Sequence, residues 1–275
     1  MSDSSKIKDA ADALVALSES VPVYKDAVQP GAVEIGKALG TIGKAVNAAL
    51  APLRLVVWGY EQIEAYLTNR VSDELADVPP ERIISPDLII AGPAVEAMKF
   101  AGHKAVLREM YARLLARAMD SDTAPSAHPA FVEIIKQMTP DEAKAMRFVW
   151  KEEAVPLITV NAKHIEPDAK ISLTSNVTER LRNFSLVGYL SSCEYPKLAP
   201  AYLDNLARLK LIDIRDLTFS DESKYEPLEA HDDLSELVDE IENTPEREVH
   251  FKRHVASITE LGRQFCSICM SPPDM

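Results

Sequence analysis

Between Gly31 and about Asn69 the chain carries a helical pattern with four small residues on one side, and this pattern constrains the fold more than any other. Apolar residues recur at intervals of three and four or their multiples, at Ile35, Leu39, Ile42, Val46, Leu53 and Val57. Beside them lie the small residues Gly36, Gly40, Gly43 and Asn47. Small side chains let a second backbone approach closely, as they do in associating membrane helices. We therefore predict a long helix, bent or broken at Pro52, whose small-residue face is a candidate helix-association face.

The same stretch has about the length of a membrane span, roughly 20 residues from Leu39 to Trp58. Two cations, Lys44 and Arg54, fall inside it, and ionisable groups are unfavourable at bilayer depth. A constitutive span is therefore not our expectation. Two interpretations stay open: a tightly packed helix in the core of a water-soluble protein, and a helix that self-associates or enters a membrane only on activation.

The four prolines between Val78 and Pro93 predict an ordered connector, since proline and the residue before it disfavour a helix. A strong helix is expected from Ala94 to about Met119, and its five bases against two acids give it a charge of +3. Its candidate basic interaction face consists of Lys104, Arg108, Arg113 and Arg117. The alternative is an ordinary solvated face whose side-chain stems pack along the core.

Further along, residues 131–138 predict a short helix, and the next helix has a clear start. Thr139 supplies an N-cap hydroxyl, Pro140 occupies the first helical position, and Glu142 supplies a carboxylate at the third. This helix is expected to end near Glu153, before Pro156.

The last third changes character. Residues 175–190 and 201–210 predict helices, 211–214 and 248–258 predict strands, and Thr259 to Phe265 predicts a final helix. This order resembles a winged-helix module. Such modules often bind DNA, but the predicted recognition helix offers only Arg208 and Lys210 against Asp204, which argues against nucleic acid as a partner.

The segment Glu226 to Glu248 holds ten acids and one arginine. Charge runs of this kind resist compaction, so we predict a solvated, mobile acidic loop. One hypothesis is that this loop docks on the basic helix and keeps the small-residue helix buried.

Charge and cysteine content exclude several classes of function. A net charge of −13 and a pI near 5.0 argue against broad attraction to nucleic acid or anionic membranes, and three cysteines cannot form a disulfide framework, so we expect a cytoplasmic protein. Zinc is a weak possibility for Cys266 and Cys269, because zinc sites usually pair two such motifs; packing cysteines are expected instead. No phosphate-binding loop or nucleophile motif stands out, so we predict no cofactor, no metal, no catalytic residues and no small-molecule substrate.

Several long stretches resemble the Abi-alpha (abortive infection alpha) family of bacterial proteins. They are GKALGTIGKAVNAALAPLRLVVWGYEQI, VPPERIISPDLIIAGPAVEAMKFAGH and LREMYARLLARAMDSDTAPSAHPAFVEIIKQMTPDEA, with weaker matches at LARLKLIDI and TELGRQF. The resemblance covers most of residues 30–146 and implies a role in bacterial defence against phage, by halting or killing the infected cell. It carries over no catalytic residue.

We therefore predict a mainly α protein: a multi-helix N-terminal domain over residues 1–153 and a small α+β, winged-helix-like module over 154–275 that contains the acidic loop 226–248. The predicted function is non-enzymatic phage defence, through a protein partner or through conditional membrane association or self-association of the small-residue helix. An unrecognised enzyme or nuclease effector and a winged-helix DNA-binding regulator are the alternatives.

Overall fold

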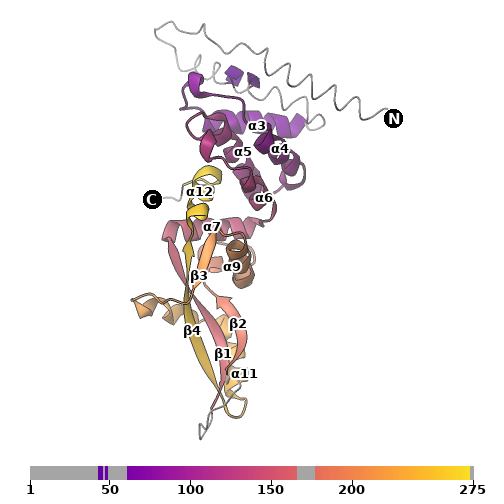
Figure 1. Ribbon diagram of the computed structural model, residues 1–275. Coiled ribbons are helices and arrows are strands. Elements are labelled where there is room, and N and C mark those ends of the chain that lie inside the picture. Colours follow the sequence, from indigo (N-terminus) through magenta and orange to yellow (C-terminus); the bar gives the residue numbers. More distant parts are fainter. Residues whose placement is uncertain (1–42, 46, 49–60, 166–176, 273–275) are drawn as a thin grey trace, which may run out of the picture.

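The computed structural model describes residues 43–45, 47–48, 61–165 and 177–272. Its elements before the sheet, in chain order, are α3 (Glu61–Glu74), η1 (Pro80–Arg82), α4 (Leu88–Ala101), α5 (Ala105–Met119), η2 (Ala124–Ser126), α6 (Ala130–Lys136) and α7 (Pro140–Glu152). Figure 1 shows α3, α4, α5 and α6 gathered at one end of the molecule, with α7 below them. Helix α5 lies against α3, α4 and α6, and its apolar stripe of Leu107, Met110 and Leu114 is buried.

The first turn of α7 explains why this helix starts where it does. The Thr139 hydroxyl accepts the N–H of Glu142 at 3.2 Å, and the Glu142 carboxylate accepts the N–H of Thr139 at 2.6 Å. These reciprocal bonds form a capping box, which satisfies two backbone donors that would otherwise lack partners. The predicted helix start at Thr139 and Pro140 is confirmed.

The remaining chain forms a four-stranded antiparallel sheet with short helices around it. The strands are β1 (Ala154–His164), β2 (Val177–Phe184), β3 (Ile212–Arg215) and β4 (Arg247–Ile258), in the order β2-β1-β4-β3. β1 pairs along its full length with β4, from Ala154 opposite Ser257 to His164 opposite Arg247. The helices of this part are α8 (Val187–Leu190), η3 (Pro196–Leu198), α9 (Ala199–Arg208), η4 (Glu222–Lys224), α10 (Glu226–Glu229), η5 (Asp232–Leu234), α11 (Ser235–Glu242) and α12 (Glu260–Cys269).

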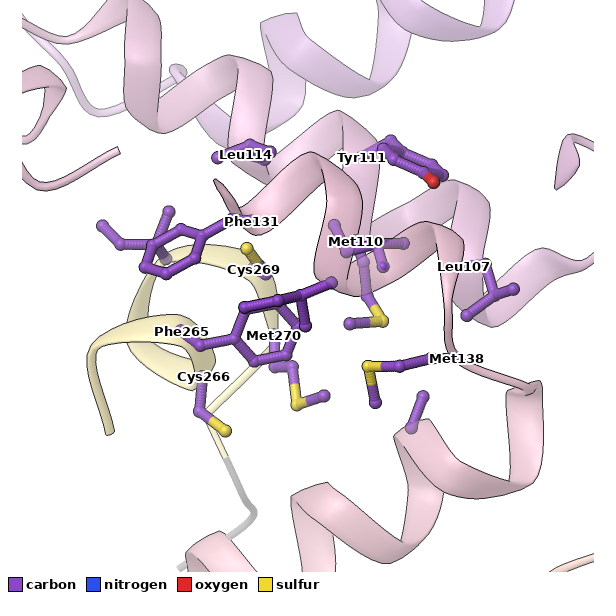
Figure 2. Packing of buried hydrophobic residues seen from close by; sticks show 14 of the residues in the cluster. Leu107, Met110, Tyr111, Leu114, Phe131, Met138, Phe265, Cys266, Cys269 and Met270 are labelled. Carbon is purple, nitrogen blue, oxygen red and sulfur yellow. The ribbon is translucent and has the colours of Figure 1, made fainter. Parts of the chain in front are cut away.

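One large apolar cluster joins both ends of the chain. It combines α3 to α7 with α9 and α12, and it includes the first residues of β1 and β3 and the last residues of β4. Figure 2 shows Phe265, Cys266 and Cys269 of α12 packed against α5 and α6, and the rings of Phe265 and Phe131 meet edge to face with centroids 5.5 Å apart. The predicted boundary at residues 153 and 154 coincides with the step from α7 to β1, but this core crosses it.

Two predictions about the middle of the chain need correction. The helix expected from Ala94 to Met119 is two helices, because the chain turns at residues 102–104 between α4 and α5. The connector expected up to Pro93 ends at Asp87, whose side chain accepts the N–H of Ile89 at 3.0 Å and so caps α4. Pro93 lies inside α4.

Mainly α with a small β part is confirmed, whereas the winged-helix topology is not. The predicted helix over 175–190 is wrong for 177–184, which form β2, and β1 was not predicted at all. The helix over 201–210, both predicted strands and the final helix are confirmed by α9, β3, β4 and α12.

The acidic segment Glu226 to Glu248 is not a solvated loop. It forms α10, η5 and α11, and it buries Leu228, Leu234 and Ile241 in a second apolar cluster with Ile158 and Val160 of β1. Apolar residues at wide intervals therefore fold this segment onto the sheet despite its charge.

Across the part of the chain that the structure describes, none of the helices has both the length and the apolar character that crossing a bilayer requires.

Candidate functional site: a polar network between α3, α5 and the C-terminal segment

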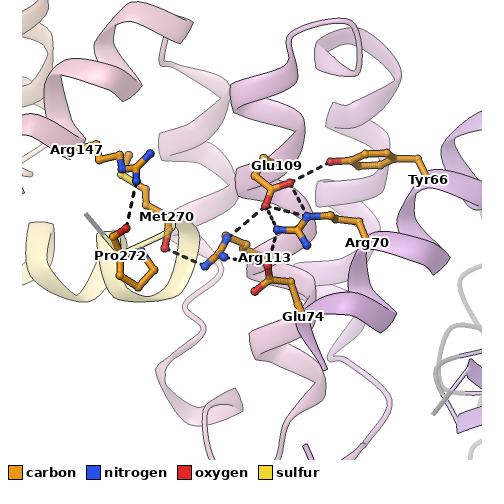
Figure 3. Close-up of polar contacts among 8 residues, drawn as sticks. All are labelled: Tyr66, Arg70, Glu74, Glu109, Arg113, Arg147, Met270 and Pro272. Carbon is orange, nitrogen blue, oxygen red and sulfur yellow. Dashed lines mark hydrogen bonds and ion pairs between the residues drawn. The ribbon is translucent and has the colours of Figure 1, made fainter. Parts of the chain in front are cut away.

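Charged side chains of α3 and α5 face each other and form a network that also reaches the chain after α12 (Figure 3). α3 contributes Arg70 and Glu74, and α5 contributes Glu109 and Arg113, each pair spaced four residues apart. Residues at this spacing lie on one face of a helix, so each helix presents one base and one acid to the other. We call these four residues, together with Tyr66, the α3–α5 network.

Glu109 is the acceptor at the centre of the α3–α5 network. Its carboxylate accepts bonds from Arg70 Nε, at 2.9 and 2.8 Å to the two oxygens, and a further bond from the Tyr66 hydroxyl at 3.2 Å. Arg70 also reaches Glu74 Oε1 at 2.6 Å. A guanidinium that binds a carboxylate through several N–H groups fixes the relative orientation of the two side chains as well as balancing their charges.

Arg113 connects the two helices to the C-terminal segment. Its guanidinium lies 2.9 Å from Glu74 Oε1 and 3.3 Å from Glu109 Oε1, and it donates a hydrogen bond to the Met270 carbonyl oxygen at 3.1 Å. The side chains of Arg113 and Glu74 are only 11% and 9% exposed, so each depends on the other for its charge balance. Arg147 of α7 makes a second link to this segment, through the Pro272 carbonyl at 3.1 Å.

The surroundings shift three pKa values in the network, and the pKa of Arg70 rises chiefly through its hydrogen bond to Glu109. The hydrogen bonds from Arg70 lower the pKa of Glu109 against the opposing effect of burial, and the charge of Arg113 lowers it further. Burial raises the pKa of Tyr66, and the neighbouring Glu109 carboxylate raises it as well. Glu109 therefore stays ionised and Tyr66 stays a hydrogen-bond donor at neutral pH.

The four residues of the predicted basic face do not share one face of α5. A helix turns about 100° per residue, so Arg108 and Arg113 point about 140° apart. Arg108 lies with its guanidinium carbon 4.1 Å from the centre of the Tyr66 ring, and Arg113 is in the network. Lys104 is exposed just before α5, and Arg117 is half-buried in its last turn.

The predicted helix-association face is described only in part. Gly36 and Gly40 lie outside the described residues, and so do Pro52 and the apolar residues named with them. Gly43 and Asn47 are helical, and a Cβ at Gly43 would meet nothing within 4 Å.

Sequence reasoning missed the α3 half of the network. The spacing of Arg70 and Glu74 was available as a signal, because opposite charges four residues apart support each other on a helix. Nothing in the sequence indicated the Met270 carbonyl, which comes from the fold alone.

The acidic segment has partners other than the basic helix. Glu229 pairs with Arg253 at 2.7 Å, Glu240 with Arg180 at 2.7 Å and Glu248 with Lys163 at 2.8 Å. None of the ion pairs found among the described residues joins this segment to α5, so the docking hypothesis is wrong for this conformation.

None of the three cysteines belongs to a group of described side chains that could bind a metal ion. Cys266 and Cys269 are fully buried among apolar side chains (Figure 2), and Cys193 is half-buried near α7. Within the described ranges, no three His, Cys, Asp or Glu side chains are placed to hold one metal ion.

The comparison with protein families identifies the class of protein. A family model described as abortive infection alpha matches residues 59–269, which include the whole α3–α5 network. The chain therefore belongs to the Abi-alpha family, and the resemblance inferred from the sequence is confirmed.

No curated protein matches the chain. One solved structure that it resembles is an uncharacterized protein from the hydrocarbon-degrading marine bacterium Alcanivorax borkumensis SK2, at 22% sequence identity and a TM-score of 0.35. That likeness covers 50% of this chain and 90% of the other.

Proposed function

We propose that this protein defends bacteria against phage by abortive infection, as its family suggests, and that it acts by exposing its small-residue segment rather than by catalysis. In the resting state, which we place in the cytoplasm, α3 is docked on α5. On infection α3 leaves α5, and the predicted helix before it associates with a protein partner, a second chain or a membrane.

The observation that carries this proposal is the position of the α3–α5 network. α3 begins at Glu61, 14 residues after Asn47, the last of the small residues Gly36, Gly40, Gly43 and Asn47, so its docking fixes the chain that leads from that segment into the core. Beside the network, the apolar side chains that α3 buries among those the structure describes, residues 65–74, are Leu67 and Val71, and Leu75 just after the helix is buried too. Two opposed ion pairs and a narrow apolar stripe make an attachment that can open as a unit.

The roles of the other buried acids support a structural rather than a catalytic use of charge. Asp120 is 2% exposed and pairs with Arg82 at 2.6 Å, and Glu142 caps α7 while it also accepts a bond from Asn205 at 2.8 Å. Each of these carboxylates is occupied by donors of the same chain.

A phage-plating assay with three variants tests the proposal. In a host that expresses the protein, Gly40→Leu together with Gly43→Leu should abolish protection at unchanged protein level, because the added side chains keep a second backbone away. Glu109→Gln should inhibit growth without phage, because it weakens the ion pair through which α5 holds Arg70 of α3. Arg182→Ala removes an exposed ion pair with Glu179 and should protect like the wild type.

Cell fractionation then separates the routes of action. Movement of the wild type to the membrane on infection, lost in the double glycine variant, supports membrane association; soluble complexes lost in that variant support association with protein. Full protection by the double glycine variant contradicts the proposal and favours an effector site elsewhere.

A further inference from the structure

Residues 187–198, which we call the strap, expose several large apolar side chains to solvent. The strap consists of α8 and η3, which pack on each other. Its exposed side chains are Tyr189 at 36%, Leu190 at 62%, Tyr195 at 58% and Leu198 at 51%. Such a concentration of exposed apolar side chains within twelve residues is typical of a surface that another molecule covers.

The strap is fixed by a buried carboxylate, so these side chains stand on an ordered backbone. Asp141 of α7, 5% exposed, accepts the N–H groups of Glu194 at 3.0 Å and Tyr195 at 2.9 Å. Gly188 lies so close to Pro196 that a Cβ would meet the Pro196 carbonyl oxygen at 2.4 Å. An ordered surface loses little conformational freedom when a partner binds.

Acidic side chains border the strap. Asp233 pairs with Lys197 at 2.8 Å and accepts the Tyr189 hydroxyl, Glu236 lies near enough to act on Lys197, and the exposed Glu194 lies beside Tyr195. Three carboxylates against one ammonium give this border a charge of −2. A partner that fits it carries an apolar tip surrounded by bases.

The same chain exposes a tip of this kind at residues 99–104, which we call the α4–α5 corner. Phe100 is 77% exposed, the highest value among the large apolar side chains of the described residues, and Lys99, His103 and Lys104 beside it are exposed too. Neither lysine forms an ion pair within the described part of the chain. Against the exposed Glu96 one turn earlier, the two lysines leave the corner with one net positive charge.

We propose that this protein assembles head to tail, with the α4–α5 corner of one chain docked on the strap of the next. The two surfaces are complementary in charge and both apolar at the centre. Both are exposed in the same chain, so they do not cover each other. The arrangement we propose is heterologous: the corner of one chain meets the strap of the next without a reciprocal contact between the same two chains. It therefore produces a ring or an open row of chains rather than a closed two-fold pair. This assembly goes beyond the release of α3 and uses none of the α3–α5 network.

Variants that damage one surface at a time test this arrangement. The full-length protein is studied by sedimentation over a range of concentrations and salt. The wild type should form complexes larger than two chains, weakened by salt because the contact is partly electrostatic. Phe100→Asp and Leu190→Asp should each be monomeric alone, with self-association weakened on the order of tenfold or more.

The decisive sample is an equal mixture of the two variants. Each keeps the surface that the other has lost, so the mixture should form complexes of two chains and none larger. Leu217→Asp changes a side chain that is 58% exposed elsewhere and should assemble like the wild type. Lys99→Glu with Lys104→Glu should abolish assembly. Mixing it with Glu194→Lys and Glu236→Lys should restore complexes larger than two chains, because alternate contacts are then wild-type and charge-exchanged, and both attract.

Several results would overturn the proposal. They are a wild type that stays monomeric at every concentration, single variants that assemble normally, a mixture that stays monomeric, or equal damage by Leu217→Asp. Glu109→Gln, which tests the proposed function, should leave this assembly intact, so failure of one proposal is distinguishable from failure of the other.

Discussion

Arg113 in the middle of α5 donates a hydrogen bond to the carbonyl oxygen of Met270, 157 positions further along the chain. The same guanidinium lies between the carboxylates of Glu74 and Glu109. One side chain thus joins the first helix after the small-residue segment to the last residues of the described chain. Loss of Arg113 therefore affects both ends of the core at once.

We expect Arg113→Ala to lower the free energy of unfolding by about 3 kcal/mol, because it leaves Glu74 buried with less compensation and the Met270 carbonyl without its donor. Arg113→Lys should be milder, since it keeps the charge and loses the fork of N–H groups. Urea unfolding measures both. Arg182→Ala, which removes an exposed pair, is the control and should cost less than about 0.5 kcal/mol. Equal losses for Arg113→Ala and Arg182→Ala would contradict the role given to Arg113.

Replacement by alanine should have opposite effects on stability at two of the glycines. A Cβ at Gly262 in α12 would meet the Leu211 carbonyl oxygen at 2.1 Å and Ile258 Cγ1 at 2.9 Å, whereas a Cβ at Gly92 in α4 would meet nothing within 4 Å. Gly262→Ala should therefore destabilise the protein by about 3 kcal/mol through overpacking. Gly92→Ala should stabilise it by about 0.5–1 kcal/mol, since alanine favours a helix interior. Thermal unfolding of the two variants should shift in opposite directions, and a shared direction would show that the packing at one of the sites is different.

Sequence reasoning succeeded where a local signal decides the structure. The capping residues Thr139 and Glu142 act within one turn, so the start of α7 could be read directly from them. The strand predicted over 211–214, which is β3, and the final helix α12, which begins after Thr259, have comparably local signals.

Sequence reasoning failed where pairing with a distant segment decides the local structure. Most of β2 is exposed, and its polar residues carry no strand pattern; β1 beside it supplies the hydrogen bonds that make it a strand. In the acidic segment, net charge predicted a loop, but Leu228, Leu234 and Ile241 reach the apolar face of the sheet. In the candidate site, the four-residue spacing of Glu109 and Arg113 is visible in the sequence, whereas the contact of Arg113 with the Met270 carbonyl is not.

The three cysteines should differ in reactivity as their burial differs. Burial raises the pKa of Cys266 and of Cys269 well above the ordinary range, and it raises the pKa of the half-buried Cys193 as well. Since the thiolate is the reactive form, a thiol reagent at neutral pH should modify Cys193 first and the other two only after unfolding. Peptide mapping of the labelled protein identifies the order, and denaturant should bring the total to three thiols per chain. Fast labelling of Cys266 in the native protein would mean that α12 leaves the core readily.

The strap should make folding stability depend on acid pH through Asp141. Burial raises the pKa of this carboxyl, but the N–H groups of Glu194 and Tyr195 and the ammonium of Lys144 outweigh it, so the net pKa lies below its ordinary 3.8. A lowered pKa means that the folded protein favours the ionised form, so this stabilisation is complete at neutral pH and is lost as the pH falls below 3.8 toward the folded-state pKa. Asp141→Asn keeps the size but turns an amide donor toward one of the N–H groups, and it should destabilise the protein by about 2 kcal/mol at pH 7. Urea unfolding of the two proteins from pH 7 to pH 3 should give a difference in free energy of unfolding that is constant near neutral pH and becomes smaller in acid. A difference that stays the same at every pH would mean that the Asp141 charge does not hold the strap.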